Sequence, residues 1–279
     1  MPELPEVETI VRDLRPRLRG EQVVHVRLGH PSLIRYPGPT AFADGLTGAT
    51  TGGLRRRGKF ILLELRGPRL VTGAVLVVHL GMSGSLCVVE AGVAERPHTH
   101  LALRLRGGGE LRFVDPRRFG RLLLGAPDEL VRLGRLPTLG PEPLGPGLPD
   151  AWWQAALRRS HRPVKALLLD QRVVAGCGNI YADEACFRAG IRPQRRADRC
   201  TRAEASALGR ALEAVLWTAI ANRGSSIASY RDGLGARGSA QRALAVYGRA
   251  GQPCSRCQAP LRGTVVAQRT TVYCRSCQR

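Results

Sequence analysis

The sequence predicts an α+β protein of several domains: a mostly β domain, a helical domain and a small metal-binding tail. Short apolar or alternating runs between residues 23 and 124 are separated by glycine, proline and basic clusters. Apolar residues at helical spacing take over from residue 152, and two cysteine pairs stand near the end. With 279 residues, 43% of them hydrophobic, the chain is long enough for two cores and a small appendix.

The first predicted domain spans residues 1–136. A helix over residues 3–18 opens it, because apolar residues recur there at helical spacing behind a proline. The later runs VVHVRL, FILLELR, VLVVHLGMSG, LALRLR, ELRFVD and RLLLG predict strands. We expect the helix to pack against these strands and so to anchor the amino terminus.

The second predicted domain, residues 151–243, follows a linker at residues 137–150 that is dense in proline and glycine. Helices are expected over residues 152–160, 164–171, 179–190 and 201–224. Their expected N-caps are Asp150, Asn179 and Thr201. Residues 224–242 are rich in glycine and serine and poor in large apolar side chains, which predicts a mobile loop.

The tail, residues 244–279, carries the most specific single motif. Two C-x-x-C pairs are separated by sixteen residues and comprise Cys254, Cys257, Cys274 and Cys277. This spacing is typical of a zinc ribbon with four thiolate ligands. Disulfide bonds are the alternative, which a cytosolic setting disfavours. Because all four ligand positions are thiolates, we expect one structural Zn²⁺ that folds a tail too small for its own core.

The charge balance points to a polyanionic partner. Lys and Arg number 43 against 22 Asp and Glu, a net charge of +21. Nucleic acid is the leading partner, an anionic membrane is the weaker one, and a GC-rich genome is the alternative explanation of the arginines. No stretch approaches the roughly 18 consecutive apolar residues of a membrane span, and the start lacks the apolar region of a signal peptide. We therefore expect a cytoplasmic protein with no membrane partner.

Only two of the 43 basic residues are lysines, Lys59 and Lys165. A compact ammonium fits, or loses its proton, where a planar guanidinium cannot. Codon bias explains many arginines but not these two exceptions, so both lysines are candidate functional residues. Chance survival is the alternative.

The start, MPELPEVETI, places a proline and a carboxylate directly after the initiator methionine. Removal of Met1 is expected to leave Pro2 as a free secondary amine beside Glu3, a candidate nucleophile with a candidate acid. At pH 7 a terminal amine is about 14% neutral and a lysine about 0.04%, so the terminal amine is the better nucleophile. The alternative is a plain helix start in which Glu3 and Glu6 favour the helix dipole.

Seven motifs follow one another along essentially the whole chain. They are PELPEVET, RRRGKF around Lys59, HLGMSG at 79–84, DPRRFG at 115–120, GCGNIYADE at 176–184, VYGR at 246–249 and the four-cysteine ribbon. In these motifs the chain resembles bacterial formamidopyrimidine-DNA glycosylase, whose close relative is endonuclease VIII. The resemblance implies an N-terminal β-sandwich with flanking helices, a helix–two-turn–helix domain and a zinc ribbon.

The resemblance also implies an activity. The protein would be a monomeric base-excision repair enzyme acting on double-stranded DNA that contains oxidised purines, chiefly 8-oxoguanine opposite cytosine and formamidopyrimidines. Pro2 would form a Schiff base with the sugar, Glu3 would serve as acid and base, and β,δ-elimination would cut the strand. The alternatives are an endonuclease VIII-like enzyme for oxidised pyrimidines and a non-catalytic damaged-DNA-binding protein.

The resemblance assigns roles to further residues. Lys59 and Arg269 join the catalytic group, Lys59 at a phosphate beside the lesion and Arg269 clamping phosphates around the flipped nucleotide. The expected DNA-binding residues are Glu6, Met82, His98, Arg117, Phe119, Lys165 and Asn179. Among these, Met82, Arg117 and Phe119 would fill the space that the extruded base leaves. Ordinary structural roles are the alternative for each, including N-capping by Asn179 and a satisfied structural histidine at position 98.

One departure from the family pattern bears on the substrate. In the family, the segment corresponding to residues 224–242 caps the extruded base and commonly ends with an aromatic residue before a glutamine. Here the sequence reads Gly238-Ser239-Ala240-Gln241. A looser cap is expected, which leaves the base preference open but not the sugar chemistry.

Overall fold

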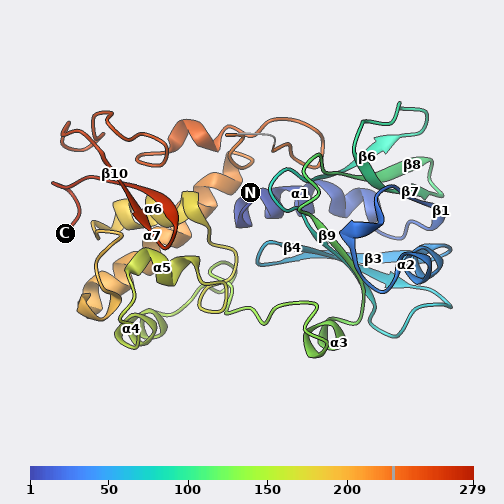
Figure 1. The fold of residues 1–279 in the computed structure, drawn as a ribbon, viewed down its shortest axis with the longest axis horizontal. Coiled ribbons are helices and arrows are strands. Elements are labelled where there is room, and N and C mark those ends of the chain that lie inside the picture. The colour runs from blue at the N-terminus through green and yellow to red at the C-terminus, as the bar shows by residue number, and fades with distance from the viewer. Residues whose placement is uncertain (228–229) are drawn as a thin grey trace. The chain divides into compact units, whose positions relative to one another are not determined.

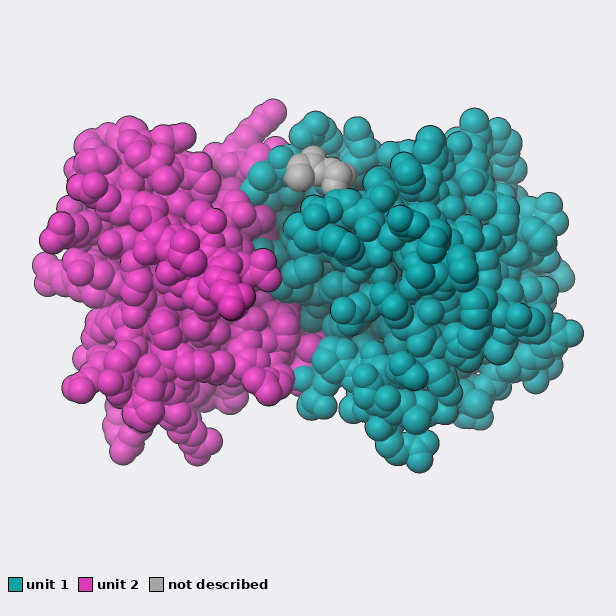
Figure 2. All heavy atoms as spheres, viewed as in Figure 1, with its two compact units in different colours: residues 1–138, 222–239 teal, residues 139–221, 240–279 magenta. Residues whose placement is uncertain are grey.

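The computed structural model describes residues 1–227 and 230–279. The chain forms two compact units, which Figure 2 distinguishes by colour. Unit 1 comprises residues 1–138 and 222–239, and unit 2 comprises residues 139–221 and 240–279. Among the helices in the described part of the chain, none is both long and apolar enough to cross a membrane.

Unit 1 contains a β-sandwich (Figure 1). One sheet is antiparallel, in the order β1 (Val23–Leu28), β7 (Thr99–Leu105), β8 (Gly109–Val114) and β6 (Ser85–Glu90). The other has the order β2 (Ile34–Tyr36), β9 (Arg121–Gly125), β5 (Val75–His79), β4 (Phe60–Arg66) and β3 (Thr50–Arg57), and β2 runs parallel to β9. Buried side chains from both sheets share one core, such as Leu103 and Val78. The predicted β domain and sandwich are thereby confirmed.

The helices of unit 1 flank the sandwich. Helix α1 (Leu4–Leu18) buries Val7, Ile10 and Leu14 in the shared core and contacts β3, β4 and β6. The sequence did not predict the 3-10 turn η1 (Pro31–Leu33) or the short helices α2 (Pro39–Leu46) and α3 (Pro127–Arg132). Both α2 and α3 begin with proline at the first turn, and neither is long enough for a helical period to stand out.

Unit 2 is mainly helical. Its elements are α4 (Asp150–Arg158), α5 (Val164–Leu169), α6 (Asn179–Ala189), η2 (Ala197–Arg199), α7 (Arg202–Ala221), η3 (Ala240–Ala243), β10 (Arg262–Val266) and β11 (Arg269–Tyr273). Helix α7 packs against α4 and α6, and α6 also contacts β11. Strands β10 and β11 form an antiparallel hairpin.

The predicted helix starts are partly correct. Thr201 caps α7, since its Oγ1 accepts the N–H of Glu204 at 3.2 Å and Glu204 Oε2 accepts the N–H of Thr201 at 2.7 Å. Asp150 and Asn179 are instead the first helical residues of α4 and α6, and their N-cap prediction is wrong by one position. Their side chains bond elsewhere: Asp150 accepts from an arginine of α7, and Asn179 donates to a carbonyl of the hairpin.

The linker and the glycine-rich loop contain little regular structure. Residues 139–149 form no helix or strand. The predicted mobile loop 224–242 includes residues 228–229, which lie outside the described residues. Its remaining part up to residue 239 groups with unit 1, where several of its polar groups bond to α1.

Candidate active site

The amino terminus of unit 1 is held in place by the first turn of α1. Pro2 is buried, and Glu3 and Glu6 are only 3% and 2% exposed. Glu6 Oε2 accepts the backbone N–H of Glu3 at 2.8 Å in a capping box, and Pro5 lies in the first turn of the helix. The chain start is therefore rigid, and two carboxylates lie beside it.

The electrostatic environment of this terminus favours a neutral amine. Burial lowers the pKa of the α-amino group of Met1, while the carboxylates of Glu3 and Glu6 oppose that shift. Lys59 and Arg117 lower the same pKa further. An amine must lose its proton before it can attack carbon, so this environment suits a nucleophile.

Lys59 lies in the tight turn between β3 and β4, directly after Gly58, whose φ is +56°. It is 7% exposed. Its charge lowers the pKa of the terminal amine and also that of His79, whose pKa burial brings down to about 4. The structure therefore places Pro2, Glu3, Glu6 and Lys59 in one electrostatic neighbourhood of unit 1.

The three predicted wedge residues lie on two loops that are joined to each other. Met82 and Phe119 are 44% and 52% exposed, and the guanidinium carbon of Arg117 lies 4.8 Å from the centre of the Phe119 ring. Large apolar side chains at such exposure are candidates for insertion into a ligand. Gly81, at φ +60°, allows the close approach, because a Cβ there would lie 2.5 Å from the carbonyl carbon of Phe119.

Asp115 holds these loops together, and the sequence analysis missed it. It is fully buried; its Oδ1 accepts from the Ser83 hydroxyl at 2.5 Å and its Oδ2 accepts the N–H of Gly120 at 2.7 Å. Ser83 in turn accepts the N–H of Arg117 at 3.2 Å. The Asp-Pro turn signal inside DPRRFG was the available indication.

His98, the predicted DNA contact, differs from the nearby His100. His100 is buried, its Nε2 lies 3.0 Å from the carbonyl oxygen of Asp115, and burial lowers its pKa. It has the character of a structural histidine. His98 is exposed, with φ +67°, and its carbonyl accepts the N–H of Asp115. Only His98 therefore presents a side chain to solvent, as a DNA contact requires.

In unit 2, Lys165 is enclosed by protein. Its side chain is 0% exposed, and Nζ lies 2.7 Å from Asp183 Oδ1, 2.7 Å from Thr271 Oγ1 and 3.0 Å from the carbonyl oxygen of Thr270. These contacts match the three N–H donors of an ammonium. In this geometry Lys165 joins α5, α6 and β11, and its contact with DNA stays a prediction.

The motif GCGNIYADE organises the C-terminal part of unit 2. Asp183 Oδ2 accepts the N–H of Val272 at 3.0 Å, and burial raises the pKa of Asp183 to about 6 although the Lys165 ammonium opposes the rise. Glu184 accepts the N–H groups of residues 245–247, which joins this motif to VYGR. Asn179 Nδ2 donates to the carbonyl of Thr270 at 3.0 Å.

The four cysteines of the tail converge. The Sγ atoms of Cys254, Cys257, Cys274 and Cys277 all lie within 4.8 Å of one another. Cys254 and Cys277 are 3.9 Å apart and Cys257 and Cys274 are 3.5 Å apart, close to the roughly 3.8 Å that a tetrahedral site with 2.3 Å zinc–sulfur bonds requires. The cluster can hold a metal ion.

Arg269 begins β11, directly after a turn in which Ala267 and Gln268 both have positive φ, 49° and 60°. Such a pair is typical of a tight hairpin turn between right-twisted strands. Arg269 is exposed, as a phosphate contact requires. The structure thus places Arg269 beside the turn of the β10–β11 hairpin, between the two cysteine pairs.

Comparisons with known proteins agree with this arrangement. Residues 1–122 match the formamidopyrimidine-DNA glycosylase N-terminal domain, and residues 139–231 match the formamidopyrimidine-DNA glycosylase H2TH domain. The formamidopyrimidine-DNA glycosylase of Moorella thermoacetica is 50% identical over 261 residues, 94% of this chain and 93% of the relative. That of Geobacillus kaustophilus is 44% identical over 280 residues and the full length of both chains.

Solved structures extend the similarity to the fold. The MutM (Fpg) protein of Thermus thermophilus is 43% identical, with a TM-score of 0.86 over 99% of this chain and 98% of that one. Lactococcus lactis Fpg bound to DNA with an abasic site has 33% identity and a TM-score of 0.89 over 99% of both chains. A mutant of the same protein bound to Fapy-dG-containing DNA reaches 0.90 at 33% identity over the full length of both. This chain belongs to the formamidopyrimidine-DNA glycosylase family.

Proposed function

We propose that this protein removes oxidised purines from double-stranded DNA, chiefly 8-oxoguanine opposite cytosine and formamidopyrimidines, and then cuts the strand at the abasic sugar. The observation that carries this proposal is the chain start: Pro2 is buried at the capped first turn of α1, beside the carboxylate of Glu3, where burial lowers the pKa of the Met1 amine. Removal of Met1 leaves the secondary amine of Pro2 as the nucleophile. Because its proposed substrate is DNA, the protein acts in the cytoplasm, where bacterial DNA lies.

The reaction follows from these groups. The nitrogen of Pro2 bonds to the anomeric carbon of the deoxyribose as the bond to the damaged base breaks. The proton that this nitrogen releases passes to the Glu3 carboxylate, and the departing base takes a proton from water. Glu3 gives a proton to the sugar ring oxygen, the ring opens and an iminium forms. Loss of a proton from the adjacent carbon expels the 3′ phosphate, a second elimination expels the 5′ phosphate, and water releases the enzyme. Lys59 stabilises a phosphate next to the lesion.

The remaining site residues bind and shape the DNA. The exposed side chains of Met82 and Phe119 enter the stack that the extruded nucleotide has left, and Arg117 bonds its former partner base. Glu6 faces the damaged base, and His98, Asn179 and Arg269 contact the backbone. Zn²⁺ at the four cysteines has a structural role, since four thiolates complete a tetrahedral site and leave no position for water. The protein acts as a monomer.

Covalent trapping tests this proposal. The protein, with Met1 removed and zinc bound, is incubated with a duplex carrying 8-oxoguanine opposite cytosine, reduced with borohydride and mapped by mass spectrometry. We expect the adduct on the peptide that begins with Pro2, and we expect less of it in Pro2→Gly, which leaves a primary amine in place of the secondary one. Glu3→Gln is the companion variant, which keeps the size of the side chain but removes its proton transfer.

The possible results separate the rival functions. A duplex with thymine glycol that reacts faster than the 8-oxoguanine duplex would favour the endonuclease VIII-like alternative, which the altered segment before Gln241 keeps open. Binding without trapping on either duplex or on an abasic duplex would refute catalysis and favour a damage-binding protein. Trapping on the abasic duplex alone would preserve the sugar chemistry and refute the assigned base.

A further inference from the structure

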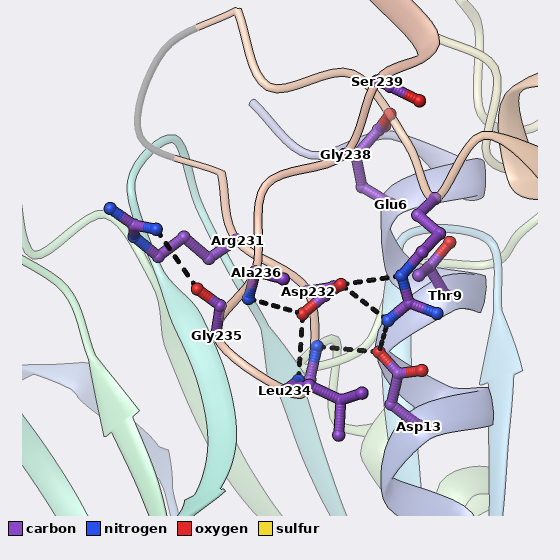
Figure 3. Close-up of polar contacts among 12 residues, drawn as sticks. Glu6, Thr9, Asp13, Arg231, Asp232, Leu234, Gly235, Ala236, Gly238 and Ser239 are labelled. Atoms are coloured by element: carbon purple, nitrogen blue, oxygen red, sulfur yellow. Dashed lines mark hydrogen bonds and ion pairs between the residues drawn. The ribbon is translucent and has the colours of Figure 1, made fainter.

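Arg223 of the 222–239 segment is bonded to two carboxylates, those of Asp13 and Asp232, which are labelled in Figure 3. Arg223 Nε and Nη2 lie 2.8 Å and 2.6 Å from Asp232 Oδ2, and Nη2 also lies 2.7 Å from Oδ2 of Asp13 on α1. The Asp232 and Asp13 side chains are 0% and 8% exposed. This carboxylate–guanidinium–carboxylate bridge joins residues 223 and 232 of the segment to each other and to the helix.

Both carboxylates also bind backbone N–H groups of the segment (Figure 3). Asp13 Oδ2 accepts from Gly233 at 3.0 Å, and Asp232 Oδ1 accepts from Leu234 at 3.0 Å and from Ala236 at 2.8 Å. Gly233 has to be a glycine for this approach, because a Cβ would lie 2.7 Å from the Cβ of Asp13. The turn at residues 232–236 is thus built around the bridge.

A second attachment lies seven residues earlier on the same helix. Glu6 Oε1 accepts the N–H of Ser225 at 2.7 Å, and the Tyr230 hydroxyl donates to the Glu6 carbonyl at 3.3 Å. Residues seven apart share one face of a helix, so Asp13 and Glu6 hold the segment at two points on one side of α1. The second point is the carboxylate that also accepts the N–H of Glu3.

The backbone at Arg223 indicates that its side chain is needed there. Its φ is +58°, in the left-handed region that favours glycine. Gly224, at φ +79°, passes so close to α1 that a Cβ would lie 3.0 Å from Glu6 Cγ. The hydrogen bonds of the guanidinium therefore stabilise the strained backbone at Arg223. This residue directly precedes Gly224, which approaches Glu6, and lies two residues before Ser225.

We propose that Arg223 is a positioning residue for base excision. It fixes the start of the 222–239 segment, residues 223–225, on α1. Ser225 then holds the Glu6 carboxylate where the extruded nucleobase is received. This inference rests on the proposed function. It predicts that loss of the bridge impairs excision of the base, which needs Glu6 and the segment, but spares cleavage of an abasic site, which has no base to receive.

Arg223→Gly and Arg223→Ala test this inference together. Glycine relieves the backbone strain and removes the bridge, whereas alanine removes the bridge alone. We expect both to lower the single-turnover rate of formamidopyrimidine excision by about tenfold, which corresponds to losing the one hydrogen bond from Ser225 to the Glu6 carboxylate. Abasic-site cleavage should stay within about twofold. Arg12→Ala is the matched control, since it removes an arginine of α1 whose carboxylate partner is Glu8; both of its rates should stay unchanged.

Amide hydrogen exchange supplies a readout that does not depend on activity. In Arg223→Ala the N–H of Gly233 and that of Ser225 should both exchange faster, because the bridge and the Glu6 contact loosen together. Asp13→Asn should act in the same way, and the double variant should be no slower in excision than Arg223→Ala alone.

Three results would overturn the inference. An unchanged ratio of excision to abasic cleavage in the Arg223 variants would show that the bridge is only structural. Faster exchange at Gly233 with unchanged exchange at Ser225 would show that the bridge does not act through Glu6. A wild-type protein inactive on both duplexes would refute the proposed function and this inference with it.

Discussion

Lys165→Met is the most decisive substitution for the buried part of unit 2. Methionine has a similar length but no charge, so it removes the ammonium and leaves the hydrophobic stem. The Asp183 carboxylate, whose side chain is 0% exposed, then loses the cation that lies 2.7 Å away. The Thr271 hydroxyl and the Thr270 carbonyl lose a donor as well.

The expected cost follows from burial. Removing one partner of a buried ion pair typically costs about 3–5 kcal/mol. Burial holds the pKa of Asp183 at about 6 even beside the ammonium, so without Lys165 this carboxyl protonates at neutral pH and avoids part of that cost. We therefore expect a loss of about 3 kcal/mol at pH 7. Lys165→Met with Asp183→Asn removes both charges and should cost about 1 kcal/mol.

Tryptophan fluorescence during urea unfolding reports the loss of stability of unit 2, which contains Lys165. The three tryptophans of the chain, Trp152, Trp153 and Trp217, all lie in unit 2, on α4 and α7. The midpoint and slope for zinc-bound wild type, the single variant and the double variant yield the three free energies of unfolding.

The opposite pattern would refute this reasoning. If Lys165→Met unfolded within about 0.5 kcal/mol of wild type while its DNA affinity fell and its salt dependence weakened by about one phosphate contact, Lys165 would contact DNA. Equal losses in the single and double variants would also contradict the ion-pair explanation.

Three further predictions concern other parts of the chain. Burial lowers the pKa of His79 to about 4, so the unfolded state binds more protons than the folded state below pH 6.5. The free energy of unfolding should therefore fall by up to about 1.4 kcal/mol for each pH unit from pH 6.5 down to pH 4. Thermal melts of His79→Gln over this pH range should show a flatter slope. Cys257→Ser should reduce bound zinc below one ion per chain and lower the melting temperature of unit 2; unchanged zinc content in elemental analysis would contradict the four-thiolate site. Gly81→Ala should destabilise unit 1 by about 2 kcal/mol more than Gly73→Ala, since both have positive φ but only the first would press on Phe119, as paired denaturation curves can show.

The sequence by itself determined the class of fold and most of the chemistry. Hydrophobic period separated the strands from the later helices, and the cysteine spacing predicted the metal cluster because four ligands at such spacing have few other uses. The composition pointed to a polyanion. Pro2, Glu3 and Lys59 could be selected because their chemistry depends on residue type and place in the chain, which a sequence displays directly.

Only the tertiary structure decided which charged residues bind within the protein. Lys165 and Lys59 looked equivalent in the sequence, yet Lys165 is enclosed by Asp183 and Thr271. Arg223 and Asp13 are 210 residues apart in the chain and meet through the fold. Short-range patterns carry no information on such partners, because burial and pairing of a charge depend on which distant segments pack against it.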